Sequence, residues 1–339
     1  ACYGWKFVRK MKLESSEMDE PNPCGNGLLS SSSSSHIEVQ NAHLDEMNND
    51  ILYHLGMERC GSSLEDRFGD VRVVVMSGTR LRAEQLANRL ISAFKCQLPV
   101  GSTLCDLCDT GRYSIYKAAH VLTVSHGVGA SSISVLLHEI TKLLYYARAK
   151  NVRFIRLGTS GGVGCPPGSV VITREAVNSE LNPWLMQTVL GKSIQRPSLS
   201  SDRLCNDLLN SARDLEGFEG VQVLLARTMC AEDFYEAQGR LDGAICEFSE
   251  SEKMEFLQKA FDFGVRNIEM ESLYFSAFCH KLNIPSAVIC STLLNRLEGD
   301  QVTDSPELIQ GYIDRAIRVV VHFLKKDHEQ AEKEESNRP

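Results

Sequence analysis

The chain has 339 residues, of which 43% are hydrophobic, and its formal net charge is −8. This length can bury a substantial core, so we expect one large folded domain. The acidic balance argues against nucleic acid as a partner, because such affinity depends on clustered Lys and Arg that meet phosphates. Any bound anion is therefore expected to be small.

The sequence also predicts a cytosolic protein with no membrane contact. No apolar run approaches the ~20 residues that cross a bilayer, and the first residues lack the apolar core of a signal peptide. The 12 cysteines are scattered along the chain, which is typical of reduced thiols rather than of a disulfide scaffold. Cys230, Cys246 and Cys290 are expected to be core residues.

Composition divides the chain into three parts. Residues 14–49 combine acids, Pro, Gly, Asn and a serine run, and too little apolar surface is present to offset chain entropy. We expect a disordered leader over 1–49, a folded domain over 50–324 and a charged, disordered tail over 325–339.

Short β-branched runs alternate with helical patterns, which is typical of an α/β fold with a central sheet. Residues 72–76 predict a strand and residues 83–94 a helix with apolar residues on one face. Residues 121–125 predict a second strand. A helix with apolar positions from 133 to 147 follows, with Ser131 or Ser132 as its N-cap.

The next predicted strand, residues 152–157, ends in a turn rich in glycine and hydroxyl residues (158–164). A strand at 169–173 follows too closely for a helix to intervene, so this pair is expected to be antiparallel and the sheet mixed. The later predicted elements are a strand at 265–270, a helix from Glu271, a strand at 286–291 and a helix from Pro306.

Nucleotide and zinc sites are not expected. Ser132 stands in place of the third glycine of a dinucleotide fingerprint, and Met186 in place of the first glycine of a P-loop ending at 191–193. Four residues come near zinc-finger spacing, but the two histidines flank a strand instead of sharing a helix face. These four are Cys105, Cys108, His120 and His126, of which the two cysteines stay a candidate redox pair.

Arg156 stands at the end of an apolar strand, where an arginine paired with a surface acid would be ordinary. Two other strand-to-helix junctions offer Gly78, Thr79 and Arg82, and His126 with Gly127. Strand ends converge on one ligand crevice in open α/β sheets, so these residues could form one site. Guanidinium groups, a threonine hydroxyl and free amides suit the oxygens of phosphate.

Seven motifs, in this order, resemble the animal-type uridine phosphorylases of the nucleoside phosphorylase family. The resemblance covers residues 52–324, and its motifs are SGTRLR, TGRYSIYK, SHGVGASSISVLLHE, IRLGTSGGVG, DFYEAQGRLDGAICEF, GVRNIEMES and TLLNRLEGDQ. It implies a three-layer α/β/α fold with a mixed, partly barrel-like central sheet. It also implies reversible phosphorolysis of uridine to uracil and ribose 1-phosphate.

The resemblance assigns roles residue by residue. It implies that a homodimer shares its active sites, with Arg112 and His54 supplied by the neighbouring subunit. The phosphate-binding residues implied are Gly78, Arg82, Arg112, Arg156 and Thr159. The nucleoside-binding residues implied are His54, Ser160, Gly161, Phe234, Gln238, Arg240, Met270 and Glu271.

Within this set, Glu271 would accept from the ribose 2′-OH, and Phe234 would stack on the base. Gln238 would recognise the amide edge of uracil, and Arg240 would stabilise charge that develops on a carbonyl oxygen. Arg156, Gln238 and Arg240 are therefore the expected catalytic residues. Positioning and electrostatics would carry the reaction, with phosphate as co-substrate and with no metal, cofactor or protein nucleophile.

Two departures from the family pattern bear on activity, and one difference from purine-cleaving relatives bears on the choice of base. Ser77 and Ala237 stand where relatives usually have glycine, which is costly if either position needs a positive φ. After Ser291 the chain lacks the Asp that purine-cleaving relatives use, which favours pyrimidines such as uridine, deoxyuridine and thymidine. The alternative to an active uridine phosphorylase is a weakened or inactive nucleoside-binding paralogue.

Overall fold

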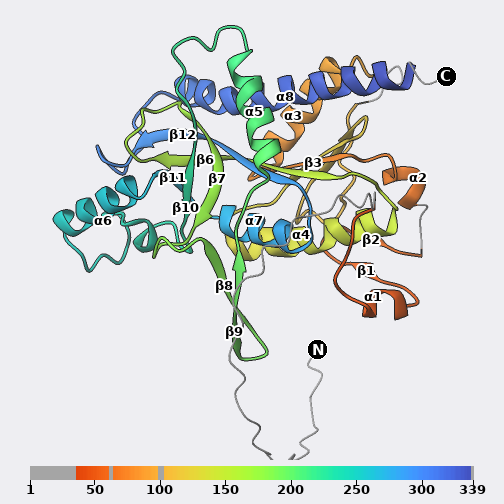
Figure 1. Cartoon of the computed structure of the whole chain (residues 1–339), viewed down its shortest axis with the longest axis horizontal. Helices are drawn as coiled ribbons and strands as arrows, with labels where there is room; N and C mark the ends of the chain where they lie inside the picture. The colour runs from red at the N-terminus through yellow and green to blue at the C-terminus, as the bar shows by residue number, and fades with distance from the viewer. Residues whose placement is uncertain (1–35, 61–63, 98–102, 337–339) are drawn as a thin grey trace, which may run out of the picture. The chain divides into compact units, whose positions relative to one another are not determined.

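The computed structural model describes residues 36–60, 64–97 and 103–336, and in them helices lie on both faces of a central sheet (Figure 1). The helices are α1 (His43–Glu46), α2 (Leu64–Phe68), α3 (Arg80–Ala93), α4 (Gly129–Tyr146), α5 (Asp202–Arg213), the 3₁₀ turn η1 (Glu236–Gln238), α6 (Glu250–Asp262), α7 (Ser272–Lys281) and α8 (Pro306–Ser336). The strands are β1 (Ile51–Leu52), β2 (Met57–Glu58), β3 (Val73–Ser77), β4 (Ile115–Ala118), β5 (Val121–Ser125), β6 (Arg153–Gly162), β7 (Val170–Val177), β8 (Trp184–Val189), β9 (Lys192–Pro197), β10 (Val223–Cys230), β11 (Val265–Glu269) and β12 (Ser286–Asn295).

The main sheet has eight strands in the order β11-β10-β7-β12-β6-β3-β5-β4. Strand β11 also pairs with β6, which closes β6, β12, β7, β10 and β11 into a barrel. Strand β12 runs parallel to β6 and antiparallel to β7, so the sheet is mixed, as expected. Strands β6 and β7 run antiparallel, as predicted for residues 152–157 and 169–173, but the expectation that they pair directly is wrong, because β12 lies between them.

Both faces of this sheet are covered, which explains its continuous β-branched runs. Alternate residues of β3 enter different hydrophobic clusters: Val74 and Met76 pack with α2, α4 and α7, whereas Val73 and Val75 pack with α3, α5 and α8. The α3–α5–α8 layer and the α4–α7 layer lie on opposite sides of the strands in Figure 1. The three layers expected from the sequence are present.

The strands and helices predicted between residues 72 and 157 are present, but two boundaries differ. Helix α4 starts at Gly129 with Val128 as N-cap and no side-chain cap, so Ser131 and Ser132 lie inside its first turn. Strand β6 continues to Gly162 through the predicted glycine turn. It does so because β12 and β11 hydrogen-bond this stretch, pairing Ser160 with Thr292 and Gly161 with Ile268.

The structure also differs from the predicted ends of the domain. Residues 1–35 of the predicted leader lie outside the described residues, but Ile37 and Leu44 are buried, so the part from residue 36 packs on the domain. The predicted tail continues helix α8 to Ser336. Three features support a helix that continues beyond Leu324. The residues of the predicted tail are good helix formers, Lys325 lies 3.8 Å from Glu329 in an i,i+4 ion pair, and Leu324 is buried.

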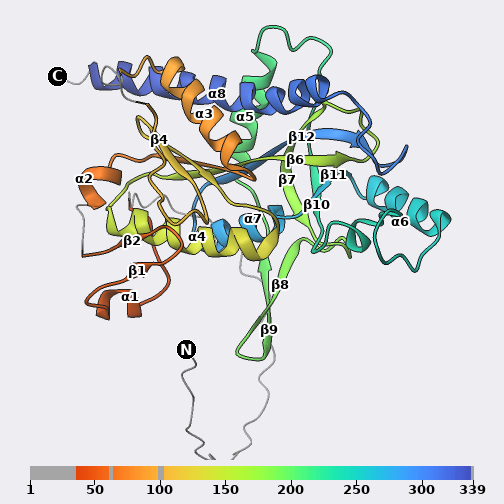
Figure 2. The same ribbon diagram turned by 180° about the vertical axis from the view of Figure 1, so that it is seen from behind.

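Strands β8 and β9 form a hairpin that projects from the barrel end of the sheet (Figure 2). Its turn places Leu190 at φ 51° and Gly191 at φ 77°, the two positive values that a tight type I′ turn requires. No helix among the described residues has the length and apolarity that crossing a membrane demands.

Candidate active site

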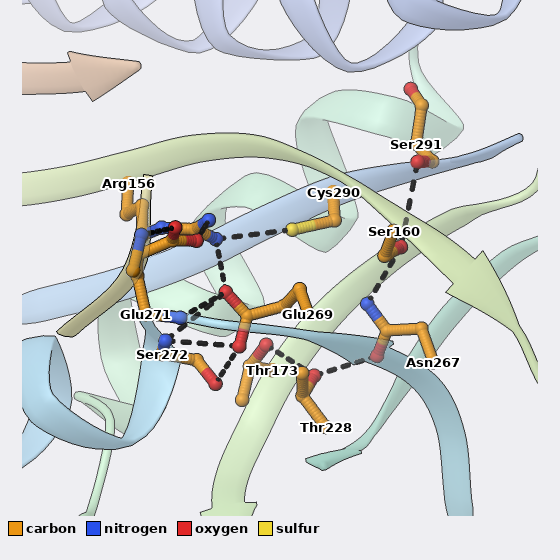
Figure 3. Close-up of polar contacts among 11 residues, drawn as sticks. Arg156, Ser160, Thr173, Thr228, Asn267, Glu269, Glu271, Ser272, Cys290 and Ser291 are labelled. Atoms are coloured by element: carbon orange, nitrogen blue, oxygen red, sulfur yellow. Dashed lines mark hydrogen bonds and ion pairs between the residues drawn. The ribbon is translucent and has the colours of Figure 1, made fainter. Parts of the chain in front are cut away.

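Arg156 is a buried arginine held by two carboxylates. Its side chain is 3% exposed, its Nη1 lies 2.7 Å from Glu269 Oε2, and its Nη2 donates to Glu271 Oε2 (Figure 3). Nη1 also lies 3.5 Å from the Cys290 sulfur. Burial alone would lower the Arg156 pKa, but the two carboxylates outweigh it and raise this pKa, so the guanidinium stays charged.

Gly158 leaves the space that this guanidinium occupies. A Cβ at Gly158 would lie 2.8 Å from Arg156 Nη1 and 2.9 Å from the Cys290 sulfur. Residues two apart on a strand face the same side, so a side chain here would collide with the arginine. Gly158 therefore lacks a side chain because the Arg156 guanidinium fills the space beside it.

Glu269 is a site residue that the sequence analysis missed. Its carboxylate accepts from the backbone N–H of Glu271 (3.0 Å) and Ser272 (2.9 Å) and from the Ser272 hydroxyl, so it caps the start of α7 while it pairs with Arg156. Burial raises the pKa of Glu269, against the opposing effect of Arg156. The only sequence signal for this role is a second acid two residues before Glu271.

Glu271 contacts both the arginine and helix α4. Its Oε1 accepts from the Gly129 backbone N–H at 2.5 Å, and its Oε2 accepts from Arg156. Burial opposes ionisation, but Arg156 lowers the Glu271 pKa below its usual value, so the carboxylate is ionised. Met270, next to it, approaches Gly129: its Cε would be 3.9 Å from a Cβ there.

The turn after β3 brings a second arginine to this cluster. Thr79 caps α3 by accepting from the Arg82 backbone N–H at 3.3 Å. Burial and then the charge of Arg156 lower the Arg82 pKa, which means that the two guanidinium groups lie near each other. Arg82 Nη1 and the His126 ring both lie beside Gly78, at 3.8 and 3.9 Å from the Cβ it lacks.

The end of β6 connects this cluster with the loop after β10. Thr159 is half-buried, and the hydroxyl of Ser160 accepts from Asn267 Nδ2 at 3.0 Å within the network of Figure 3. Gly161 lets Arg296 pass, because a Cβ would lie 2.9 Å from Arg296 Cγ. Arg296 in turn donates to the Gln238 carbonyl at 2.8 Å.

The loop that contains Phe234, Gln238 and Arg240 is stabilised by its own ion pair, which does not involve Arg156. Arg240 donates to Asp242 from Nε (2.8 Å) and Nη2 (2.5 Å), and its guanidinium lies 4.6 Å from the centre of the Phe234 ring. Gln238 and Arg240 are buried, whereas Phe234 is 46% exposed. Asp300 also holds this loop, because its carboxylate accepts from the Leu241 backbone N–H at 3.0 Å.

His54 and Arg112 form a third group, apart from the first two. The His54 carbonyl accepts from Thr110 Oγ1 at 2.6 Å, which ties its turn to the loop of Arg112. Glu139 lies 2.7 Å from His54 Nδ1 and also accepts from its backbone N–H. In the described part of the chain Arg112 is exposed and its guanidinium makes no hydrogen bond or ion pair. The polar partners of Arg156 among these residues are Glu269, Glu271 and Cys290, and they include neither His54 nor Arg112.

The two substitutions for glycine cause no backbone strain. Ser77 ends β3 and Ala237 lies in η1, and neither is among the residues with positive φ. The backbone cost that the sequence left open is therefore absent at both positions.

The cysteines and histidines set aside as a zinc site do not gather. Within the described residues no group of three or more His, Cys, Asp or Glu side chains could hold a metal. The ten described cysteines are free; Cys230 and Cys290 are buried, as predicted, but the prediction that Cys246 is a core residue is wrong, since it is exposed. Burial raises the Cys290 pKa to about 12, so this thiol beside Arg156 stays protonated.

Comparison with known proteins connects this geometry with one family. The family model of the phosphorylase superfamily matches residues 72–325. Uridine phosphorylase 1 of Mus musculus is 41% identical over 291 residues, 86% of this chain and 92% of its own. Inactive uridine phosphorylase B of Schistosoma mansoni is 36% identical over 290 residues, 86% of this chain and 96% of its own.

The fold is similar over the same extent. The crystal structure of uridine phosphorylase from Schistosoma mansoni in complex with thymidine superimposes with a TM-score of 0.81 at 36% identity, and the match covers 86% of this chain and 98% of that chain. This likeness confirms the α/β fold with a mixed, partly barrel-like sheet that was expected from the sequence.

Proposed function

The chain belongs to the phosphorylase superfamily, among its uridine phosphorylases, and we propose that it cleaves uridine with phosphate to give uracil and ribose 1-phosphate. It is in this proposal a pentosyltransferase, with deoxyuridine and thymidine as further substrates. The observation that carries the proposal is the cluster of Arg82, Arg156 and Glu271 beside Gly78, tied through β6 to the loop of Gln238.

Phosphate is the nucleophile and lies on Arg82, Arg156, Thr159 and the Gly78 turn. A phosphate oxygen bonds to C1′ of the ribose while the C1′–N1 bond breaks and its electron pair leaves with uracil. Glu271, held ionised, orients the ribose through the 2′-OH. The proposed reaction involves no electron transfer, so we propose no cofactor; phosphate is a co-substrate.

The uracil leaving group is stabilised by the loop after β10. Arg240 uses Nε and Nη2 for Asp242 and has Nη1 for a uracil carbonyl oxygen that gains charge. Gln238 offers a donor and an acceptor to the amide edge of the base, and the exposed Phe234 ring is available for stacking. Proton uptake by the departing base completes the reaction.

A homodimer with shared sites is the proposed active unit. His54 and Arg112 are grouped with each other and not with Arg156, and the neighbouring Tyr53 is 72% exposed. These features support a role for the partner subunit's Arg112 at the phosphate and the partner subunit's His54 at the ribose 5′-OH. The free thiols and the chemistry of nucleoside salvage support a cytosolic location.

One assay decides between the active enzyme and the inactive nucleoside-binding paralogue. Protein incubated with uridine and phosphate should release uracil, whereas phosphorolysis of inosine should be slower. Gln238→Ala and Arg240→Ala should remove most uridine turnover while the melting temperature stays near wild type. Absence of uracil release would support the paralogue, and preference for inosine would contradict the pyrimidine assignment.

A further inference from the structure

His126 is a buried histidine whose ring has no partner in the described residues. It follows β5, the residue is 1% exposed, and neither Nδ1 nor Nε2 has a partner at hydrogen-bond geometry, although the Gly127 backbone is near enough to act weakly on the charge of the ring. Its backbone is fixed, because its N–H donates to the Ser77 carbonyl at 2.7 Å and its carbonyl accepts from Ser132 Oγ at 2.5 Å. A buried polar group without a partner is costly, so these two nitrogens require an explanation.

The surroundings of the ring are those of the phosphate site. His126 Cε1 and Arg82 Nη1 lie 3.9 and 3.8 Å from the point that a Cβ on Gly78 would occupy. Arg156 and Glu271 are close enough to act on its charge. The imidazole therefore stands among the two guanidinium groups and the turn to which the proposed function assigns phosphate.

The charge state of the ring follows from these neighbours. Burial and then the charge of Arg156, with a smaller contribution from Arg82, lower the His126 pKa to about 3 against the opposing effect of Glu271. The ring is neutral near pH 7, and a neutral imidazole has one N–H donor and one acceptor nitrogen. It can thus add a hydrogen bond at this position without adding a third positive charge.

We propose that His126 is a phosphate-binding residue that donates one ring N–H to a phosphate oxygen beside Arg82 and Arg156. The inference rests on the proposed function, which supplies the ligand. The ring nitrogens are unpartnered because their partner is the substrate. The tautomer leaves the other nitrogen as an acceptor for a hydroxyl of the bound ligand.

Binding of inorganic phosphate alone tests this inference without any turnover. His126→Phe keeps a flat ring but removes both nitrogens, and it should bind phosphate about 10- to 100-fold more weakly in a calorimetric titration. Without phosphate, its melting temperature should equal or exceed that of the wild type, because two buried unpaired nitrogens are gone. Equal phosphate affinity of the two proteins would overturn the proposal.

Two amide variants separate hydrogen bonding from shape. The Asn amide can replace Nδ1 and the Gln amide Nε2, so His126→Asn or His126→Gln should bind phosphate more tightly than His126→Phe. No recovery in either would mean that the ring acts by shape, which overturns the proposal. In ¹⁵N-histidine-labelled wild-type protein, the His126 ring resonances should shift as phosphate saturates the site; unchanged resonances contradict it.

His120 is the matched control, because it precedes β5 and His126 follows it. These residues are six apart on an extended chain, roughly 20 Å, and His120 stacks on Phe94 with ring centres 5.5 Å apart. His120→Phe should bind phosphate like the wild type. If the wild-type protein binds phosphate but releases no uracil from uridine, the proposed function alone is refuted. If the wild-type protein does not bind phosphate, the inference about His126 is overturned, whatever the activity.

Discussion

Replacing Gly158 with alanine tests whether the Arg156 guanidinium needs the space that this glycine leaves. The new Cβ would stand 2.8 Å from Arg156 Nη1, and ordinary contact begins at 3.4 Å, so the guanidinium would have to retreat by about 0.6 Å. It cannot rotate freely, because Glu269 and Glu271 hold its two ends. Overpacking of this kind typically costs about 1–3 kcal/mol of folding free energy.

The effect on activity should exceed the effect on stability. Misplacement of a substrate-positioning group by about 1 Å can cost about 100-fold in rate, so we expect kcat/KM for phosphate to fall roughly 10- to 100-fold. Steady-state phosphorolysis with varied phosphate measures this, and thermal melting measures stability. Gly311→Ala is the control: nothing lies within 4 Å of a Cβ there, and alanine in this helix should stabilise by about 0.5–1 kcal/mol.

A double variant identifies the cause. Cys290 Sγ is the second atom that the new Cβ would meet, at 2.9 Å, so Cys290→Ala opens space into which the guanidinium can move. Gly158→Ala with Cys290→Ala should therefore recover part of the loss, with a coupling of about 1 kcal/mol. Unchanged activity and stability of Gly158→Ala, or a loss that Cys290→Ala does not relieve, would refute the steric reasoning.

Three further predictions concern other parts of the site. Arg112→Ala and Arg156→Ala dimers should each be nearly inactive. After subunit exchange, verified by mass, about half of the random pairs are heterodimers with one intact site of two, so the mixture should recover about a quarter of wild-type activity. A mixture that stays inactive contradicts shared sites. Glu139→Gln weakens the contact that holds the His54 ring, so it should raise KM for uridine several-fold. The KM for 5′-deoxyuridine should stay unchanged, because this substrate lacks the 5′-OH that His54 is proposed to bind. Equal increases for both substrates would exclude this role of His54. The His126 pKa is about 3 in the folded protein and about 6.5 in the unfolded chain, so between pH 6.5 and 3 only the unfolded chain takes up the proton. From pH 7 to pH 4.5 the wild type should therefore lose about 2.5 kcal/mol more unfolding free energy than His126→Phe, and parallel losses would contradict this.

The layered core could be predicted because its signal is local. The runs at 72–76 and 121–125 are rich in apolar, β-branched residues, and the helices after them carry apolar residues on one face. Strands buried on both sides and helices buried on one side impose these patterns wherever such a sheet forms. The predicted strands and the α3 stripe were therefore close to the structure.

The barrel closure and the length of β6 could not be predicted from local pattern. Residues 158–162 are rich in glycine and look like a turn, yet they are strand because β12 and β11 provide hydrogen-bonding partners more than 100 positions away in the chain. In the same way Ile37 belongs to the folded part through its contact with a distant cluster. Such features depend on tertiary partners that composition does not reveal.

The candidate site shows the same division. Arg156 and Glu271 were expected, and the structure places them in contact. Glu269 and Arg296 were missed, because each acts through a neighbour: one caps α7 beside the arginine, and the other supports the Gln238 carbonyl. A residue that serves another side chain leaves only a weak trace in a single sequence.

The paired carboxylates around Arg156 have a consequence for the direction of the reaction. This buried cation has Glu269 and Glu271 as counter-ions, so in the proposed function an arriving phosphate would exchange with a carboxylate that already pairs with Arg156. In the same proposal, the two carboxylates would pair with Arg156 again when ribose 1-phosphate leaves. Because an uncompensated charge in the interior is strongly unfavourable, such exchange keeps both loading and unloading free of a deep energetic trap. A reaction that must run in either direction benefits from that balance.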